Sequence, residues 1–288
     1  MPKVHSFFDS ATNTISHLVV DEATKACAVI DSVLDYEPNA AKISFESADA
    51  IIELIEKQGL HLEWIIETHA HADHLSAAPY IQQKLGGKIA IGESIKIVQE
   101  VFGKIFNFGT EFARDASQFD HLFKDGDTFM LGSIQGRAIY TPGHTPADMT
   151  YVIGDAAFVG DTLFMPDYGT ARCDFPGGSA ETLYESAQKI FALPESTRLF
   201  MCHDYLPQGR KDFAWETTVG EEKEKNIHLG RVAGKSKAEF VQMRAARDAT
   251  LGMPHLILPS IQVNIQAGRL PKAENNGVSY LKIPLGQL

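Results

Sequence analysis

The sequence predicts an α/β domain, in which short strands and amphipathic helices follow one another along most of the chain. Runs rich in branched and aromatic residues recur between turns that contain glycine or proline, and helical apolar patterns separate many of them. The chain has 288 residues, of which 44% are hydrophobic and 22% charged, so it can bury a sizeable core and is not disordered. Interleaved elements of both kinds predict packed layers of helices and sheets.

The first part of the chain predicts three strands and two helices. The strands are expected at 14–20, 26–31 and 62–69, and the helices at 45–58 and 76–87. Apolar residues of the first helix recur at helical spacing, and Gly59 stands where a C-cap glycine belongs. Pro79 fits only the first turn of the second helix, because proline lacks the backbone N–H that later turns need.

The middle of the chain predicts a long insertion and a second group of strands. The insertion covers 94–123, with helical structure at 95–102, and is followed by strands at 127–131, 134–141, 149–153, 156–160 and 198–203 and a helix at 179–194. The insertion could form a lid or a contact between two copies of the chain, and its role stays open.

The end of the chain predicts helices and an irregular tail. Capping-box pairs mark two helix starts, Thr218 with Glu221 and Ser236 with Glu239. The tail from Pro254 onward is rich in Pro, Asn and Gly, and we expect one short strand in its SIQVNI stretch, residues 260–265. We expect residues 1–215 to form the domain that carries the candidate site, and residues 216–288 to pack on that domain.

Composition also limits the partners and the location. With 26 basic and 37 acidic residues the net charge is −11, which disfavours nucleic-acid binding but permits a local basic pocket for a small anion. No apolar run approaches the ~18 residues of a membrane-spanning helix. Three widely spaced cysteines and the lack of a signal-peptide pattern predict a cytoplasmic protein that contacts no membrane. By base rate, a homodimer is expected.

Seven residues of metal-ligand type follow predicted strands. They are His69, His71, Asp73, His74, His144, Asp161 and His203. Strand ends tend to meet at one edge of a sheet, so these side chains are expected to converge rather than lie scattered over a surface loop. Residues i and i+2 of an extended chain face the same side, so the first two histidines can bind one ion together. Imidazole and carboxylate suit zinc, iron or manganese.

Residue types alone suggest two ions. One would be held by His69, His71 and His144, the other by Asp73, His74 and His203, with Asp161 as the bridge. This is the arrangement of a hydrolase in which metal-bound water is the nucleophile.

The His-x-His-x-Asp-His signature at 69–74 resembles the metallo-β-lactamase superfamily, and so do TPGHTPADMTYVIGD, FVGDTLF and CHDY. The resemblance covers roughly residues 14–205. It implies an αββα four-layer sandwich with the metal site at one edge of two sheets, followed by a C-terminal helical and irregular extension. The stretch Ala171 to Phe175, followed by Gly177 and Gly178, is similar to the persulfide dioxygenase branch, which neighbours glyoxalase II.

That branch oxidises glutathione persulfide with O₂ to sulfite and glutathione at one non-haem Fe(II). Carried over, its ligands are His69, His144 and Asp161, a two-histidine, one-carboxylate set suited to iron and O₂. The other four residues, His71, Asp73, His74 and His203, would then orient the ligands and bond to water at the metal. Zinc could replace iron. The alternatives are a dinuclear zinc hydrolase of the glyoxalase II type and a non-enzymatic metal-dependent persulfide-binding protein.

The same resemblance implies cationic contacts for glutathione. Arg172 stands where the glyoxalase II branch has a basic contact, and Tyr205 matches a tyrosine of that branch. Arg210 and Lys211 follow in the same loop. Two other interpretations stay open: Arg172 could form a structural ion pair with Asp174 or another acid, and the two later cations could be solvated surface residues.

Two cysteines lie near the predicted site in sequence. Strand alternation predicts that Cys202 points away from His203 and belongs to the core. The role of Cys173, in a loop close to the site, stays open.

Overall fold

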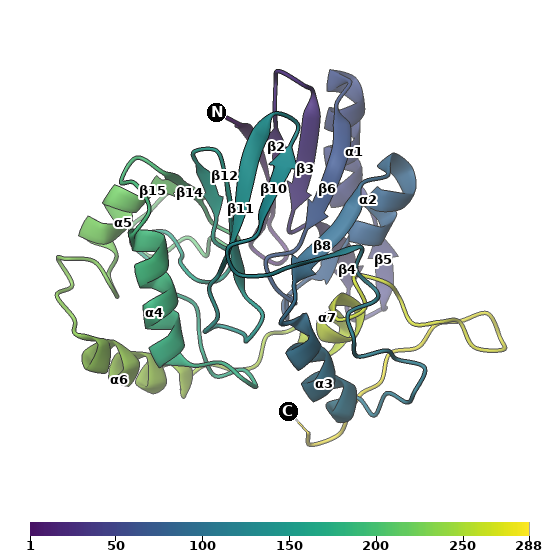
Figure 1. The fold of residues 1–288 in the computed structure, drawn as a ribbon. Helices are drawn as coiled ribbons and strands as arrows, with labels where there is room; N and C mark the ends of the chain where they lie inside the picture. The colour runs from purple at the N-terminus through teal and green to yellow at the C-terminus, as the bar shows by residue number, and fades with distance from the viewer. Residues whose placement is uncertain (288) are drawn as a thin grey trace.

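Two six-stranded sheets packed face to face organise the computed structural model, which describes residues 1–287 (Figure 1). The first sheet has the order β1-β2-β3-β6-β8-β9, with β1 (Lys3–Asp9), β2 (Thr14–Val20), β3 (Ala26–Ile30), β6 (His61–Ile66), β8 (Lys88–Gly92) and β9 (His121–Phe123). The second has the order β10-β11-β12-β13-β14-β15, with β10 (Thr128–Leu131), β11 (Ile134–Tyr140), β12 (Met149–Ile153), β13 (Ala156–Phe158), β14 (Arg198–Phe200) and β15 (Glu216–Thr218).

The inner faces of the two sheets form a continuous apolar core. Buried side chains of the first sheet, such as Ile30 and Ile66, pack with Tyr151, Phe158 and Phe200 of the second. The strands β2, β3 and β13 are buried along their whole length because both faces of their sheets are covered, whereas β10 alternates between buried and exposed residues. This packing fixes the two sheets relative to each other.

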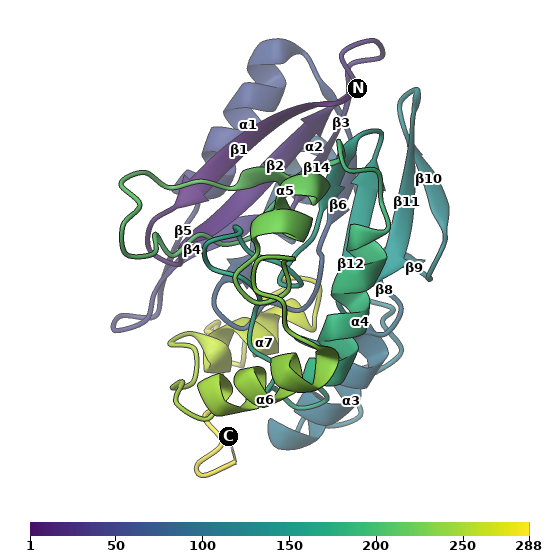
Figure 2. The same cartoon turned by 90° about the vertical axis from the view of Figure 1, so that its left-hand side faces the viewer.

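Helices cover the two outer faces. α1 (Glu46–Gln58) and α2 (Ala78–Leu85) pack on the first sheet, and α4 (Ala180–Phe191) packs on the second (Figures 1 and 2). The layers are therefore helix, sheet, sheet and helix, which is the predicted αββα sandwich. α1 buries Ile51, Ile52 and Ile55 and ends at Gly59, whose left-handed φ of 62° forms the expected C-cap.

Among the remaining elements, α5 (Val219–Lys225) lies beside α4 and β15. The others are α3 (Ile95–Ile105) in the 94–123 insertion, α6 (Lys237–Asp248), α7 (Ile257–Asn264) and a small sheet of β5 (Lys42–Ser44), β4 (Val33–Glu37) and β7 (Leu75–Ser76). Among residues 1–287 no helix is both long and apolar enough to cross a bilayer.

Residues 260–265 are a correction to the sequence analysis. The expected strand in SIQVNI is wrong, because most of this stretch belongs to the helix α7. A short apolar run has no periodicity that separates a buried strand from a buried helix. Ile257, Ile261 and Asn264 follow helical spacing, and all three are buried.

Only one of the two expected capping boxes is complete in the described structure. Ser236 accepts from the backbone N–H of Glu239, whose carboxylate accepts from the Ser236 N–H, so this box is complete. Thr218 caps α5, but the carboxylate of Glu221 accepts from Thr217 and Lys225 instead. Strand β15 lies just beyond the expected boundary at 215 and pairs with β14, so the C-terminal segment contributes to the second sheet.

Glu222 is a fully buried acid on α5, outside the candidate site. One carboxylate oxygen accepts from the side-chain amide of Asn226 at 2.6 Å, and the other, Oε1, has no hydrogen-bond partner. Burial raises the pKa of Glu222 from its usual value to about 8. The carboxyl group is therefore protonated at neutral pH in the folded protein.

This raised pKa predicts a pH-dependent stability. Between about pH 4.5 and pH 8 the unfolded chain ionises Glu222 while the folded protein keeps its proton, so the contribution of this group falls as pH rises. Glu222→Gln should change stability little at pH 5 and increase it by up to about 3 kcal/mol at pH 8. Urea unfolding at both pH values measures this, with Glu224→Gln, at a half-exposed acid of the same helix, as control. An equal stability difference at the two pH values would contradict the assignment.

Candidate metal centre

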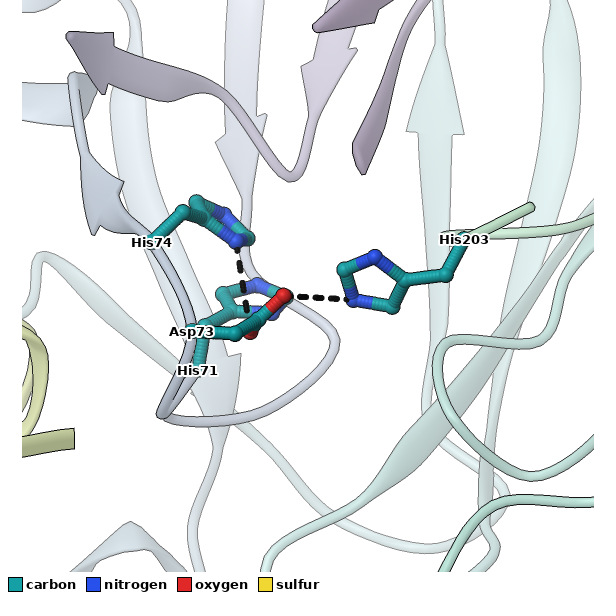
Figure 3. A group of neighbouring side chains, drawn as sticks. All are labelled: His71, Asp73, His74 and His203. Carbon is teal, nitrogen blue, oxygen red and sulfur yellow. Dashed lines mark ion pairs between the residues drawn. The ribbon is translucent and has the colours of Figure 1, made fainter. Parts of the chain in front are cut away.

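All seven residues of metal-ligand type lie at one edge of the sandwich, in loops that follow four strands. The loop after β6 carries four of them, and the other three follow β11, β13 and β14. Two groups have donor atoms within 4.8 Å of one another: His69, His144 and Asp161 in one, and His71, Asp73, His74 and His203 in the other. Asp161 lies between them, because its Oδ1 is also 3.5 Å from Nε2 of His203. Figure 3 shows the second group, with its side chains turned toward one another.

Hydrogen bonds fix the ring orientation of the two histidines of the first group. The hydroxyl of Thr68 donates to Asp31 at 2.9 Å, so it accepts from Nδ1–H of His69 at 3.0 Å. Nδ1–H of His144 donates to the backbone carbonyl of Arg172 at 2.8 Å. Each ring therefore presents the lone pair of its Nε2 to the centre.

His71 is held from the opposite side of its ring. Its Nε2 lies 3.0 Å from a carboxylate oxygen of Asp31 and 3.2 Å from one of Glu67, and all three side chains are buried. Burial disfavours the charged imidazole, but the two carboxylates outweigh this and raise the pKa of His71 well above its usual value. Nδ1 of His71 has no hydrogen-bond partner and faces the other donors.

The last two histidines follow the same pattern. Nδ1–H of His203 donates to the backbone carbonyl of Asn13 at 3.2 Å. Nδ1 of His74 lies 3.3 Å from the Thr14 hydroxyl and 3.5 Å from Asp73. Nε2 of both rings has no hydrogen-bond partner, although that of His203 lies 3.2 Å from the second oxygen of Asp73 (Figure 3). A lone pair on each ring therefore remains for a cation.

The donor atoms fit a bound metal. Six buried atoms of the centre have no hydrogen-bond partner: His69 Nε2, His71 Nδ1, His74 Nε2, His203 Nε2, Asp73 Oδ2 and Asp161 Oδ1. Buried polar atoms without a partner cost free energy, so such a cluster indicates a ligand that satisfies them together. Neutral imidazoles and carboxylates are ligands for zinc or iron. Burial lowers the pKa of His69 well below its usual value, which keeps this ring neutral for metal binding.

Cys202 is another correction. Its thiol lies within 4.8 Å of donor atoms of Asp161 and His203, so the expected orientation away from the site is wrong. Strand β14 ends at Phe200, and the alternation of a strand does not extend to the next residues. Cys173 is buried, and its backbone N–H donates to a carboxylate oxygen of Asp248 at 2.9 Å.

The sequence analysis missed three residues that position the centre. Asp31 and Glu67 directly follow β3 and β6, so each had the same strand-end signal as the histidines. Asn264 of α7 had no such signal. Its side-chain amide donates to the backbone carbonyls of His71 and His74, both at 2.8 Å. Its oxygen accepts from the N–H of Ser76 at 2.8 Å, so one side chain holds the second half of the metal loop, residues 67–74 between β6 and β7.

A cavity of about 550 Å³ opens at the centre. Asp73, His144 and Asp161 line one part of it, and Arg172 and Tyr205 also line it. Arg210 and Lys211 do not. Arg210 pairs with Asp204 and Asp167, and Lys211 is exposed to solvent.

Arg172 carries the ion pair that the sequence left open. Its Nε and Nη2 each lie 2.6 Å from an oxygen of Asp174, and Nη1 donates to the carbonyl of Gly252 at 2.6 Å. The guanidinium also stacks on the ring of Phe175, 5.1 Å from its centroid. Both its charge and its fork geometry are therefore already engaged within the protein.

Known proteins resemble this chain over most of its length. A family model described as the metallo-beta-lactamase superfamily matches residues 13–203. A probable metallo-hydrolase of Burkholderia pseudomallei is 56% identical, with 98% of each chain covered. Glyoxylase B2 of Dictyostelium discoideum is 51% identical, with 99% of this chain and 98% of that protein covered.

More distant similarity leads to persulfide dioxygenases. The human mitochondrial persulfide dioxygenase ETHE1 is 29% identical, with 92% of this chain and 88% of that protein covered. The crystal structure of ETHE1 from Myxococcus xanthus matches with a TM-score of 0.72 and 29% identity, covering 93% of this chain and all of that one.

The contacts of Asn264 generate a prediction about the metal loop. Asn264→Ala leaves two carbonyls and one N–H of this buried loop without a partner, so stability should fall by about 2 to 4 kcal/mol. Because the loop carries four candidate ligands, metal affinity should also fall about 10- to 100-fold. Competition against a fluorescent chelator measures the affinity, and urea unfolding the stability.

Gln266→Ala is the matched control. Gln266 lies just beyond α7, and among residues 1–287 its side chain bonds only to the carbonyl of Gln262. This variant should bind metal like the unaltered protein. Equal metal affinity in Asn264→Ala and Gln266→Ala would show that Asn264 does not position the loop.

Proposed function

Since the chain belongs to the metallo-β-lactamase superfamily, whose members are metal-dependent enzymes, we propose that it oxidises glutathione persulfide with O₂ to sulfite and glutathione at one Fe(II). Similarity to ETHE1 proteins in sequence and in structure supports this proposal. On the same basis, glutathione persulfide and O₂ are its proposed substrates. The cytoplasmic location and the homodimer expected from sequence stay predictions.

One observation carries the proposal. The donor atoms of His69, His144 and Asp161 form one compact group, and His71 falls in another, although Oδ1 of Asp161 also lies 3.5 Å from Nε2 of His203. Two imidazoles and one carboxylate with free positions opposite them are the ligand set of non-haem iron enzymes that use O₂. In the dinuclear alternative His71 would share an ion with His69 and His144.

The chain's own residues would perform three tasks. His69, His144 and Asp161 would hold Fe(II), which when bound supplies the redox chemistry between O₂ and a persulfide sulfur. The hydrogen bonds from Nδ1–H of the two rings keep Nε2 aimed at the centre. The cavity has Phe164 and Phe175 among its walls, and these rings limit the access of water to the reacting atoms.

A dinuclear zinc hydrolase is the second candidate. The second group has the four ligand-type side chains that a second metal ion would need. Each of its three histidines has one ring nitrogen without a hydrogen-bond partner. The 56% identical relative is named a probable metallo-hydrolase, which also favours hydrolysis. Tyr205, which lines the cavity, is kept as a proposed substrate contact. Arg172 also lines the cavity, but Asp174 and the carbonyl of Gly252 already engage its guanidinium.

Metal content and O₂ uptake separate the two candidates. Anaerobically loaded protein should bind one iron per chain and consume about one O₂ per glutathione persulfide, with sulfite formed. Asp161→Ala should lose both iron and O₂ uptake, because it removes the one carboxylate of the proposed ligand set. Metal analysis, an oxygen electrode and a sulfite assay give these values.

Asp115→Ala is the control, since Asp115 is exposed in the 94–123 insertion. It should leave iron content and uptake unchanged. Absence of O₂ uptake by the iron-loaded protein would contradict the dioxygenase. Two tightly bound zinc ions together with thioester hydrolysis would establish the hydrolase in its place.

A further inference from the structure

Three arginines line the cavity, and two of them are neutralised within the protein. Arg172 pairs with Asp174, as described above. Arg244 of α6 is fully buried, pairs with Asp248 and donates to the carbonyl of Thr170 at 3.1 Å. These two guanidinium groups are held by the fold.

Arg247, one turn after Arg244 on α6, is different. It has no carboxylate or carbonyl acceptor among residues 1–287. Its guanidinium lies over the ring of Tyr168, 5.5 Å from the centroid, and its Nη1 lies 3.3 Å from Nε2 of His228. It therefore has a defined place in the cavity wall and donors to spare.

The contact with His228 does not satisfy Arg247. Nδ1 of His228 accepts from the backbone N–H of Thr170 at 3.0 Å, so the neutral ring carries its proton on Nε2. Two donors then face each other. Burial and the neighbouring arginines lower the pKa of His228 to about 3, which agrees with a neutral ring. The ring therefore accepts no hydrogen bond from the guanidinium and leaves its charge unneutralised.

A row of aromatic rings joins Arg247 to the metal centre. Tyr168, under the guanidinium, lies 5.1 Å from Tyr205, and Tyr205 stacks on His203 at 5.7 Å. All distances are between ring centroids. A ligand that extends along this wall meets the metal donors at one end and an unneutralised cation at the other.

We propose that Arg247 binds a carboxylate of the thiol-derived substrate, so that the enzyme accepts small anionic persulfides and discriminates against uncharged ones. This inference rests on the proposed function for the thiol-derived character of the substrate. A volume of about 550 Å³ suits a molecule of tripeptide size. A guanidinium fork matches a carboxylate in geometry and in charge, and a partly buried pair of this kind contributes substantially to affinity.

Binding of S-methylglutathione tests the proposal without turnover, because its sulfur is blocked. Its diethyl ester lacks both negative charges and serves as the matched uncharged probe. By titration calorimetry, Arg247→Met should weaken S-methylglutathione binding by about 10- to 100-fold and leave the affinity for the ester unchanged. Arg247→Lys should retain part of the affinity, since the charge remains but the fork is lost.

Arg231→Met is the control, because the Arg231 side chain is 80% exposed and, within the described part of the chain, pairs only with Glu224. It should bind both probes like the unaltered protein. A wild-type protein that does not prefer the acid over the ester, or an Arg247→Met variant that keeps the preference, would overturn the anchor. O₂ uptake with glutathione persulfide is measured separately, so loss of the anchor with uptake intact leaves the proposed function standing. Absence of O₂ uptake while Arg247 still determines the preference for the acid would contradict only the proposed dioxygenase activity.

Discussion

Every histidine of the candidate centre must present a bare nitrogen inside a dry space, and this requirement shapes the rest of the structure. A buried imidazole does so only when its other nitrogen is held by an acceptor. The acceptors come from both halves of the sandwich: Asp31 and Glu67 beside the first sheet, the carbonyl of Arg172 beyond the second, and Asn13 in the turn between β1 and β2. The two sheets must therefore be packed against each other before all the histidines of the centre are oriented.

The α/β class and the positions of the metal-type residues follow from local signals, and the four-layer arrangement from the resemblance of the metal-site motifs. Period, caps and turn residues located three strands of the first sheet, five of the second and the helix that ends at Gly59, but not β1, β8, β9 or β15. Other features depend on contacts that local patterns do not carry. Residues 260–265 form a helix because tertiary packing decides between strand and helix in a short apolar run. Asn264 reaches Ser76 across 188 residues of sequence, and no local pattern announces such a bond.

Charge is distributed unevenly in this acidic protein. The net charge is −11, yet three arginines line one cavity. Asp174 and Asp248 neutralise two of them. The number of basic residues near the site in the sequence therefore does not reveal which arginine lacks a carboxylate partner. The loop that contains Arg210 and Lys211 had the more obvious basic signal, but Asp204 and Asp167 engage the first and solvent surrounds the second. The free cation comes from α6, beyond the expected boundary at 215.

The bond from Asn264 to the metal loop also orders events during synthesis. The metal loop leaves the ribosome early, but the side chain that holds it belongs to α7, near the other end of the described chain. A nascent chain therefore exposes four candidate ligands on a loop that lacks its clamp until α7 has emerged and docked. During that interval the loop has the chemistry of a metal chelator without the geometry of a selective one. Selection of the correct metal thus belongs to the last stage of folding and not to the first.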